Sequence, residues 1–182
     1  MKHIKLPLTQ ETLCQLRAGD SCLLTGVLYT ARDAAHKRLC DAINRGEKLP
    51  IELKDTTIYF TGPDPAKPGA VIGPCGPTTS YRMDAYSPTL IEQGLTGMIG
   101  KGRRSQEVVE AMKGRAVYFG AAGGCGALLA QCVQACEVVA YPDLGTEAIR
   151  RLEVVDMPVT VIIDSLGNDL YVDGPAQYLK SK

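Results

Sequence analysis

The chain has 182 residues, with 20 Lys plus Arg and 20 Asp plus Glu, so its formal net charge is zero. A chain of this length can bury a core of its own, and we expect one domain over residues 1–182. The balanced charge argues against nucleic acid or an acidic membrane as partner, and the sequence contains no run of 18 apolar residues. Because the first residues, MKHIKLPLTQETL, also lack the apolar segment of a signal peptide, we expect a soluble, cytoplasmic protein.

Seven cysteines occur, an odd number with no Cys-x-x-Cys pair, which argues against a closed zinc site and against a secreted disulfide framework. Cys14, Cys22 and Cys40 are expected to be small buried hydrophobic residues, whereas Cys75 and Cys125 lie in glycine-rich turns. Cys132 and Cys136 are four residues apart in an expected helix, where core packing and a shared metal are both open. The seven positions are Cys14, Cys22, Cys40, Cys75, Cys125, Cys132 and Cys136.

The first 62 residues are expected to form an extended segment with a polar turn, then a strand, a helix and a second strand. Thr30 is expected to cap that helix through a capping-box variant, Thr30-Ala-Arg-Asp33, and the helix should end near Gly46. The ranges for these elements are 1–20 for the lead-in, 22–29 for the first strand, 31–45 for the helix and 56–61 for the second strand.

The segment Gly73-Pro-Cys-Gly-Pro-Thr-Thr-Ser-Tyr-Arg-Met-Asp84 is the most informative part of the chain. If a helix begins at Pro77 or Thr78 and runs to about Gln93, Thr78 and Arg82 lie one turn apart on the same face. Free N–H groups at a helix start, a hydroxyl and a guanidinium together would bind a carboxylate or phosphate. A capped helix with one exposed arginine is the alternative interpretation.

The remaining residues predict more alternation of strands and helices, with extra strands at the C-terminus. Ser105 should cap one helix, the glycine turn 121–126 should lead into another, and Ser165–Asn168 should form a hairpin turn. The expected strands are 95–99, 116–119, 138–141, 159–164 and 169–172. This order is typical of an α/β fold with a mixed sheet.

Two further cations stand out. Arg32 falls in the first turn of a helix, where the helix dipole disfavours a positive charge, so it either points into solvent or has an anion to bind. Lys101 stands between two glycines directly after a strand, which lets its backbone turn sharply and its ammonium approach a ligand. Neither the phosphate-loop motif nor the dinucleotide-binding glycine pattern is present, and His36 is expected to be structural.

Several motifs together resemble the β subunit of class I, iron–sulfur fumarate hydratases, a family that includes L(+)-tartrate dehydratase. The resemblance covers about residues 5–175, and Gly-Pro-Thr-Thr-x-x-Arg-Met is its most specific element. The motifs are Ala31-Arg-Asp-Ala-Ala-His-Lys-Arg38, Gly76-Pro-Thr-Thr-Ser-Tyr-Arg-Met-Asp84, Gly100-Lys-Gly102, and Glu147-Ala-Ile149, Pro158 and Gly167-Asn-Asp-Leu-Tyr171. Arg103 departs from the pattern, because a small polar residue is expected after Gly102.

The resemblance implies a swivelling β/β/α domain that docks on a larger α subunit, as a heterodimer or a tetramer of two α and two β subunits. The α subunit would carry a 4Fe–4S cluster, and no metal ligand is expected in this chain. The reaction implied is the reversible hydration of fumarate to (S)-malate. Thr78 would serve in proton transfer, and Arg32, Arg82 and Lys101 would bind the dicarboxylate substrate.

Two alternatives stay open. Within the family, the substrate could be tartrate or a methylated fumarate, because a methyl or hydroxyl difference is often worth only about 1–3 kcal/mol. Outside it, the chain could be a non-catalytic anion-binding module that serves as a scaffold for a partner. Cys75, directly before the motif, could also be exposed in the site.

Overall fold

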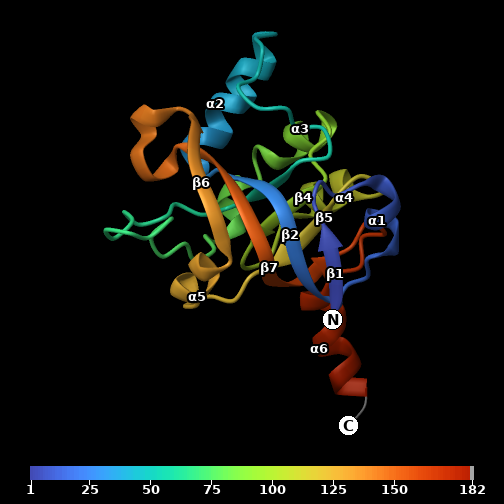
Figure 1. Cartoon of the computed structure of the whole chain (residues 1–182). Coiled ribbons are helices and arrows are strands. Elements are labelled where there is room, and N and C mark those ends of the chain that lie inside the picture. Colours follow the sequence, from blue (N-terminus) through green and yellow to red (C-terminus); the bar gives the residue numbers. More distant parts are fainter. Residues whose placement is uncertain (181–182) are drawn as a thin grey trace.

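Within residues 1–180, which this computed structural model describes, seven strands form one mixed sheet in the order β1-β2-β3-β4-β5-β7-β6 (Figure 1). The strands are β1 (Lys2–Lys5), β2 (Ser21–Thr30), β3 (Thr57–Tyr59), β4 (Gly97–Gly100), β5 (Val117–Gly120), β6 (Val133–Ala140) and β7 (Ile149–Ile163). The expected α/β fold with a mixed sheet is confirmed.

The sheet closes on itself. β2, β3, β4 and β5 are successive parallel neighbours, while β7 runs antiparallel to β5 at one of its ends and to β2 along most of its length. β7 can do this because it has 15 residues, and residues 157–161 are alternately buried and accessible, which is typical of a strand with two different faces. The carboxyl ends of the four parallel strands therefore meet at one rim of a closed ring.

The helices of residues 33–44, 87–92 and 106–112 pack on one side of this ring, and strand β1 packs on the other with the helices of residues 10–15 and 126–131. The helices are α1 (Gln10–Gln15), α2 (Asp33–Asn44), α3 (Ser87–Glu92), α4 (Gln106–Met112), α5 (Gly126–Gln131) and α6 (Leu170–Lys180), with 3-10 turns η1 (Ser80–Met83) and η2 (Pro142–Glu147). α2 and α6 extend away from the body of the molecule at opposite ends in Figure 1.

Two hydrophobic cores result from the strand period of two. Phe60 and Tyr118 pack into the core beneath α2, α3 and α4, whereas their neighbours Tyr59 and Phe119 point to the core shared with β1 and α1. All four side chains are fully buried. Burial of large aromatic groups on both faces fixes the parallel strands between two layers, so the rim that they form is rigid.

Several expected elements are wrong in position or type. The helix expected from Pro77 is a short 3-10 turn at Ser80–Met83 followed by α3, and Thr79 still has an extended backbone. The expected strand at 169–172 is the start of α6; Ser165–Asn168 does turn the chain, but only one bridge, between Ile163 and Asp169, follows it. Tertiary contacts override local preference in each case.

The expected capping box at Thr30 is also wrong. Thr30 ends β2, and its hydroxyl donates to the carbonyl of Ala148 and accepts from the N–H of Arg150. The N-cap of α2 is Arg32, without a side-chain cap. In contrast, Ser105 caps α4 as expected, accepting from the N–H of Val108 at 3.4 Å.

The cysteines differ partly from expectation. Cys22 and Cys40 are buried as expected, but Cys14 is exposed, and Cys75 is fully buried and not open to the site. Cys132 follows α5 directly and Cys136 lies in β6, so the two are not on one helix. No helix among residues 1–180 is long and apolar enough to cross a membrane.

Candidate functional site

The residues singled out in the sequence gather at the rim where the parallel strands end. Arg32 follows β2, Lys101 follows β4, and the glycine turn 121–126 follows β5. Thr78 joins them after β3, because its N–H donates to the carbonyl of Phe60 at 2.6 Å. Ligands of α/β proteins bind at the carboxyl ends of the parallel strands, in closed barrels as in open sheets, so this rim is the candidate site.

Thr78 is positioned by backbone pairing with the lysine turn, not by a helix. The N–H of Lys101 donates to the carbonyl of Thr78 at 3.3 Å, and the N–H of Ser80 donates to the carbonyl of Lys101 at 2.8 Å. Thr79 and Lys101 therefore form a parallel bridge that extends β4 by one pair. The two residues of the site come together by this ladder, and Thr78 itself is half-buried.

Arg32 and Arg82 come together through a carboxylate that lies between them. Asp33 accepts from Nε of Arg82 at 2.9 Å through Oδ1, and its Oδ2 lies 2.9 Å from Nη2 of the same guanidinium. The Nε of Arg32 lies 4.0 Å from that Oδ2, too far for a hydrogen bond. One carboxylate thus holds two cations that belong to different elements.

Arg32 has a second carboxylate partner and a donor to spare. Glu147 of η2 lies 3.5 Å from Nη2 of Arg32 through Oε1, while its Oε2 accepts from the N–H of Ala34 at 3.0 Å in the first turn of α2. The Nε of Arg32 is buried and has no hydrogen-bond partner among the described residues. Because an unpaired buried donor is costly, this N–H is suited to a ligand oxygen.

Glycines give the cations room to reach the rim. A Cβ at Gly62 would lie 2.8 Å from Nη1 of Arg32, and a Cβ at Gly123 would lie 3.9 Å from Nζ of Lys101. The turns after β3 and β5 therefore pass directly beneath the two side chains. Gly126 packs equally closely on Gly76, where a Cβ would meet the backbone N at 2.9 Å, so the glycine turn also fixes the segment before Thr78.

His36 lies below the rim as a buried, structural residue. Its Nδ1 is 2.9 Å from the carbonyl oxygen of Arg32, so Nδ1 carries the proton and donates it. Burial lowers the pKa of His36 to about 4, and the nearby Arg104 lowers it further while the bond to Arg32 opposes this. A neutral imidazole at this place cannot supply a charge at neutral pH, in agreement with its expected structural role.

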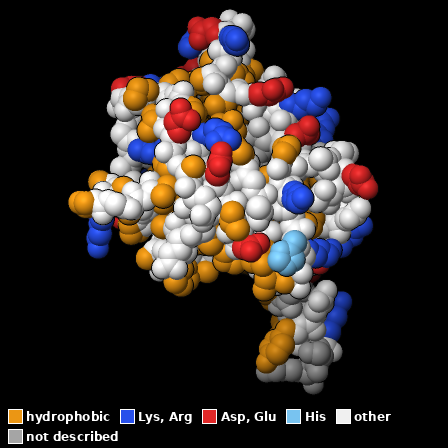
Figure 2. Space-filling model, viewed as in Figure 1, with side chains coloured by type: hydrophobic (Ala, Val, Ile, Leu, Met, Phe, Trp, Pro, Cys, Tyr) orange, Lys and Arg blue, Asp and Glu red, His pale blue; other side chains and the backbone are white. Residues whose placement is uncertain are grey.

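The rim is open on this chain. The side chains of Arg82 and Lys101 are exposed, and a cavity of about 480 Å³ lies elsewhere, between loop 63–73 and strand β6. The face seen in Figure 2 carries acidic and basic side chains next to one another, as expected for a chain without net charge. Three cations and a hydroxyl at an open rim can bind a dianion, but they enclose it from one side only.

The donors needed for a metal cluster are not gathered in the described part of the chain. Residues 1–180 contain no group of three His, Cys, Asp or Glu side chains that could hold a metal ion. Burial raises the pKa of Cys22, Cys40 and Cys75 to about 11 each, which opposes formation of the thiolate that metals need. These cysteines do not fit an iron–sulfur cluster.

Asp33 and Glu147 are the functional candidates that the sequence did not single out. In the sequence, Asp33 stands out only as a helix cap and as part of the motif 31–38, although its position beside Arg32 could suggest an ion pair. Glu147 lies 115 residues after Arg32 in the chain, and no local pattern connects the two. The contacts of both carboxylates with the arginines form only in the folded chain, where the end of β2 lies beside η2.

Comparison with known proteins adds an independent finding. A family described as "Fumarase C-terminus" matches residues 1–174. The chain is 41% identical over 164 residues to the aerobic class I fumarate hydratase of Salmonella typhimurium, covering 88% of this chain but 28% of the relative. It is 43% identical over 162 residues to the anaerobic class I fumarate hydratase of Escherichia coli, covering 87% and 30%.

A relative of similar length also exists. The chain is 37% identical over 178 residues to a Methanocaldococcus jannaschii protein provisionally named L(+)-tartrate dehydratase subunit beta, with 94% of this chain and 91% of the relative covered. The chain therefore spans less than a third of the two fumarate hydratases but nearly all of this subunit.

Proposed function

Because this chain belongs to the fumarase C-terminus family, we propose that it is the β subunit of a class I fumarate hydratase. With a larger, cluster-bearing α subunit it catalyses the reversible hydration of fumarate to (S)-malate. The observation that carries the proposal is the rim itself, where Arg32, Thr78 and Lys101 follow the ends of three parallel strands and Arg82 is bound to Asp33, the neighbour of Arg32.

The cations have a distinct task in this reaction. Fumarate and malate carry two carboxylates, and the planar fork of an arginine matches a carboxylate with two parallel hydrogen bonds. Arg82 uses Nε and Nη2 toward Asp33, so Nη1 and the second N–H of Nη2 are free of that contact and can bind a second anion. Arg32 offers its unpartnered Nε, and Lys101 supplies an exposed point charge.

Proton removal beside a carboxylate builds up negative charge on that carboxylate. Fixed cations that are already oriented stabilise this charge without reorganising at the moment of reaction. The same three residues therefore bind the ground state and favour the transition state. The orientation of Arg82 by Asp33 and of Arg32 by Glu147 supports this assignment for the two arginines.

Thr78 takes part in proton transfer at the substrate carbon. A threonine hydroxyl is a weak base in water, so it needs a neighbouring proton acceptor and a site without bulk solvent. This chain leaves the rim open, and we assign both the acceptor, a carboxylate, and the cover to the α subunit. The half-buried position of Thr78 beside Lys101 is consistent with a hydroxyl that becomes enclosed on assembly.

The 4Fe–4S cluster belongs to the α subunit in this proposal. The described cysteines do not form a ligand set, and three of them have a pKa of about 11. The lengths of the relatives support a division of labour, because this chain corresponds to 28% of one fumarate hydratase and to 91% of a separate β subunit. The assembly would be a heterodimer or a tetramer with two copies of each subunit, in the cytoplasm.

Tartrate is the second candidate substrate, favoured by the similarity along almost the full length to a protein named as a tartrate dehydratase subunit. Tartrate carries one more hydroxyl than malate, and the same clamp would hold both of its carboxylates. In this proposal the α subunit completes the substrate pocket, so the choice between fumarate and tartrate is made by turnover assays of the whole complex.

The test is anaerobic purification of the native complex, with iron and sulfide assays and turnover of fumarate and tartrate. A larger partner that carries about four irons per heterodimer and forms malate is the expected result. Tartrate turnover without fumarate turnover would keep the site but change the substrate. An iron-free chain that binds dicarboxylates but has no hydratase partner would replace the proposal with an anion-binding scaffold.

A further inference from the structure

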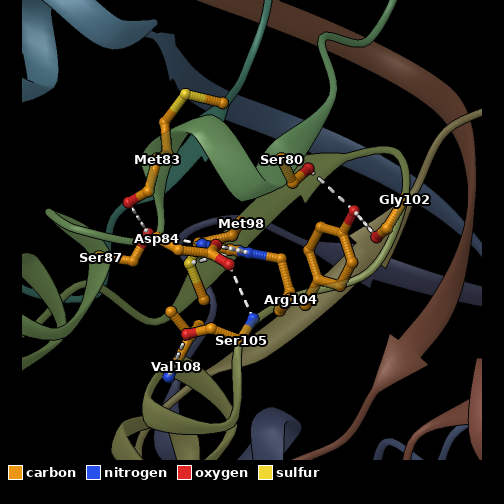
Figure 3. Close-up of polar contacts among 10 residues, drawn as sticks. Ser80, Met83, Asp84, Ser87, Met98, Gly102, Arg104, Ser105 and Val108 are labelled. Atoms are coloured by element: carbon orange, nitrogen blue, oxygen red, sulfur yellow. Dashed lines mark hydrogen bonds and ion pairs between the residues drawn. The ribbon is translucent and has the colours of Figure 1, made fainter.

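We infer that Arg104 is a positioning residue of this site, which fixes from below the segments that carry Thr78, Arg82 and Lys101. The inference rests on the proposed function, because it names what keeps the proposed groups in register. Figure 3 shows the guanidinium of Arg104 next to the side chains of Asp84, directly after η1, of Ser87 in α3 and of Met98 in β4. Its side chain is fully buried, although it belongs to a loop beside the exposed Lys101.

Arg104 first fixes the end of η1, the turn that carries Arg82. Its Nε donates to Oδ1 of Asp84 at 2.6 Å, and Oδ2 of Asp84 accepts from the N–H of Ser105 at 2.7 Å. Its Nη2 donates to Oγ of Ser87 at 2.6 Å, and that hydroxyl donates to the carbonyl of Met83 at 2.9 Å. Two routes therefore connect one guanidinium to the last turn of η1.

Arg104 also contacts two aromatic rings that hold the other site residues. Its Cζ lies 5.3 Å from the ring centroid of Phe60 and 5.1 Å from that of Tyr118. The carbonyl of Phe60 accepts from the N–H of Thr78, so a shift of Phe60 would move Thr78. The hydroxyl of Tyr118 donates to the carbonyl of Gly102 at 2.9 Å and accepts from Ser80 at 2.8 Å.

The fourth site residue, Arg32, is connected to the same layer. His36 packs edge-on against Phe60 with ring centroids 5.2 Å apart, and its Nδ1 donates to the carbonyl of Arg32. His36, Phe60, Arg104 and Tyr118 thus form a continuous layer under the rim, which we call the support layer. Thr78 and Arg32 are bonded directly to members of this layer, Lys101 is held through the neighbouring Gly102, and Arg82 is reached through Ser87, which accepts from Arg104 and donates to Met83.

Close packing leaves the support layer little freedom. Ser80 occupies the space where a Cβ at Gly100 would stand, and that Cβ would lie 2.9 Å from the ring of Phe60. Burying an ion pair contributes little net stability, since desolvation offsets the attraction, so stability does not explain a buried Arg104. A buried pair with fixed geometry does specify orientation, and misplacement of a catalytic group by about 1 Å can reduce a rate by about 10²-fold.

The experiment uses the purified complex with the α subunit and two variants of this chain. Arg104→Lys keeps the charge but loses the planar guanidinium. Tyr118→Phe keeps the ring but loses the hydrogen bonds to the carbonyl of Gly102 and to the hydroxyl of Ser80. We expect kcat/KM per cluster-loaded complex to fall by about 10²-fold in the first and about tenfold in the second, with a rise in KM. Amide exchange in residues 78–84 and 100–104 should accelerate in both.

Two controls separate positioning from general destabilisation. Leu13→Ala opens a cavity in the other core, so it lowers stability without touching the support layer. Arg115→Lys makes the same conservative change at an exposed arginine. Both should keep kcat/KM per folded complex and the exchange of residues 78–84.

Chemical rescue adds a sharper readout. Arg104→Ala leaves a guanidinium-sized space between two aromatic rings, so millimolar guanidinium should restore part of kcat where sodium chloride at equal ionic strength does not. Unchanged kcat/KM and unchanged exchange in both Arg104→Lys and Tyr118→Phe would overturn the inference. A wild-type complex without hydratase activity would remove the proposed function, and amide exchange alone would then decide whether Arg104 orders these segments.

Discussion

Asp33 and Arg82 form a two-point ion pair, with Nε to Oδ1 and Nη2 to Oδ2 both at 2.9 Å, across 49 residues of sequence. The same carboxylate faces Arg32, the residue that precedes it in the chain. The two arginines of the proposed clamp are therefore oriented by a residue of this subunit before any substrate arrives. Such pre-orientation reduces the entropy that is lost on binding.

The Asp33–Arg82 pair should matter for activity more than for stability. The two side chains are 29% and 42% exposed, and exposed pairs contribute at most about 1 kcal/mol to folding. We expect Asp33→Asn to leave thermal unfolding nearly unchanged and to lower kcat/KM about tenfold.

Arg82→Met should lower kcat/KM further, by about 10²–10³-fold, because a substrate carboxylate is left unpaired.

Arg103→Met is the matched control for Arg82, since Arg103 is also exposed and lies two residues from Lys101. Steady-state kinetics of the complex measure all three variants. An equal loss in Arg103→Met and Arg82→Met would mean that general positive charge, and not the clamp, determines the effect.

Thr78→Ala should remove most turnover while assembly and iron content stay normal. A positioned group that transfers a proton is typically worth about 10²–10⁴-fold in rate. Thr78→Ser keeps the hydroxyl and should retain much of kcat, which separates the chemical role from packing. Single-turnover kinetics with quantified clusters provide the measurement, and near-normal turnover of Thr78→Ala would exclude the residue from the mechanism.

The buried imidazole of His36 should make the free energy of unfolding depend on pH. Its pKa is about 4 in the folded chain and about 6.5 in an unfolded one, so the unfolded chain binds the extra proton between these values. Stability from this group is complete above pH 6.5 and is lost as pH falls toward 4, by about 1.36 kcal/mol per pH unit and roughly 3 kcal/mol in total.

Urea unfolding of the isolated chain between pH 7 and 4.5 measures this slope. His36→Gln should be less stable at neutral pH but should lose this part of the pH dependence. Asp20, whose pKa is lowered from 3.8 by Lys2 and Arg17 against the effect of burial, titrates below the window. A slope that is identical in the wild type and in His36→Gln would contradict the assigned protonation state.

The thiols should react in order of their burial. Cys14 is exposed, whereas Cys22, Cys40 and Cys75 are buried and have a pKa of about 11. At pH 8 we expect iodoacetamide to modify Cys14 first and those three only on unfolding, because the thiolate is the reactive form. Peptide mass spectrometry over time measures the order, and early modification of Cys75 would show that the loop before Thr78 opens.

Local chemistry in the sequence is enough to predict most strands and to select the four candidate site residues. Apolar runs with β-branched residues indicate β2 to β5. Lys101 stands out because it lies between two glycines, which are the residues that allow a sharp backbone turn directly after a strand. Ser105 is recognisable as a helix cap in the sequence, because its hydroxyl accepts from the N–H of Val108, only three residues further along the chain.

Tertiary structure decided what depends on residues far apart in the chain. The Gly-Pro-Thr-Thr segment does not start a helix, because the N–H of Thr78 is taken by Phe60 and its carbonyl by Lys101. Asp33 pairs with Arg82, Glu147 approaches Arg32, and Arg104 is buried between two aromatic rings only once the ring of strands closes. The sequence by itself thus determined which groups could do chemistry, whereas their orientation came from non-local contacts, which no local spacing encodes.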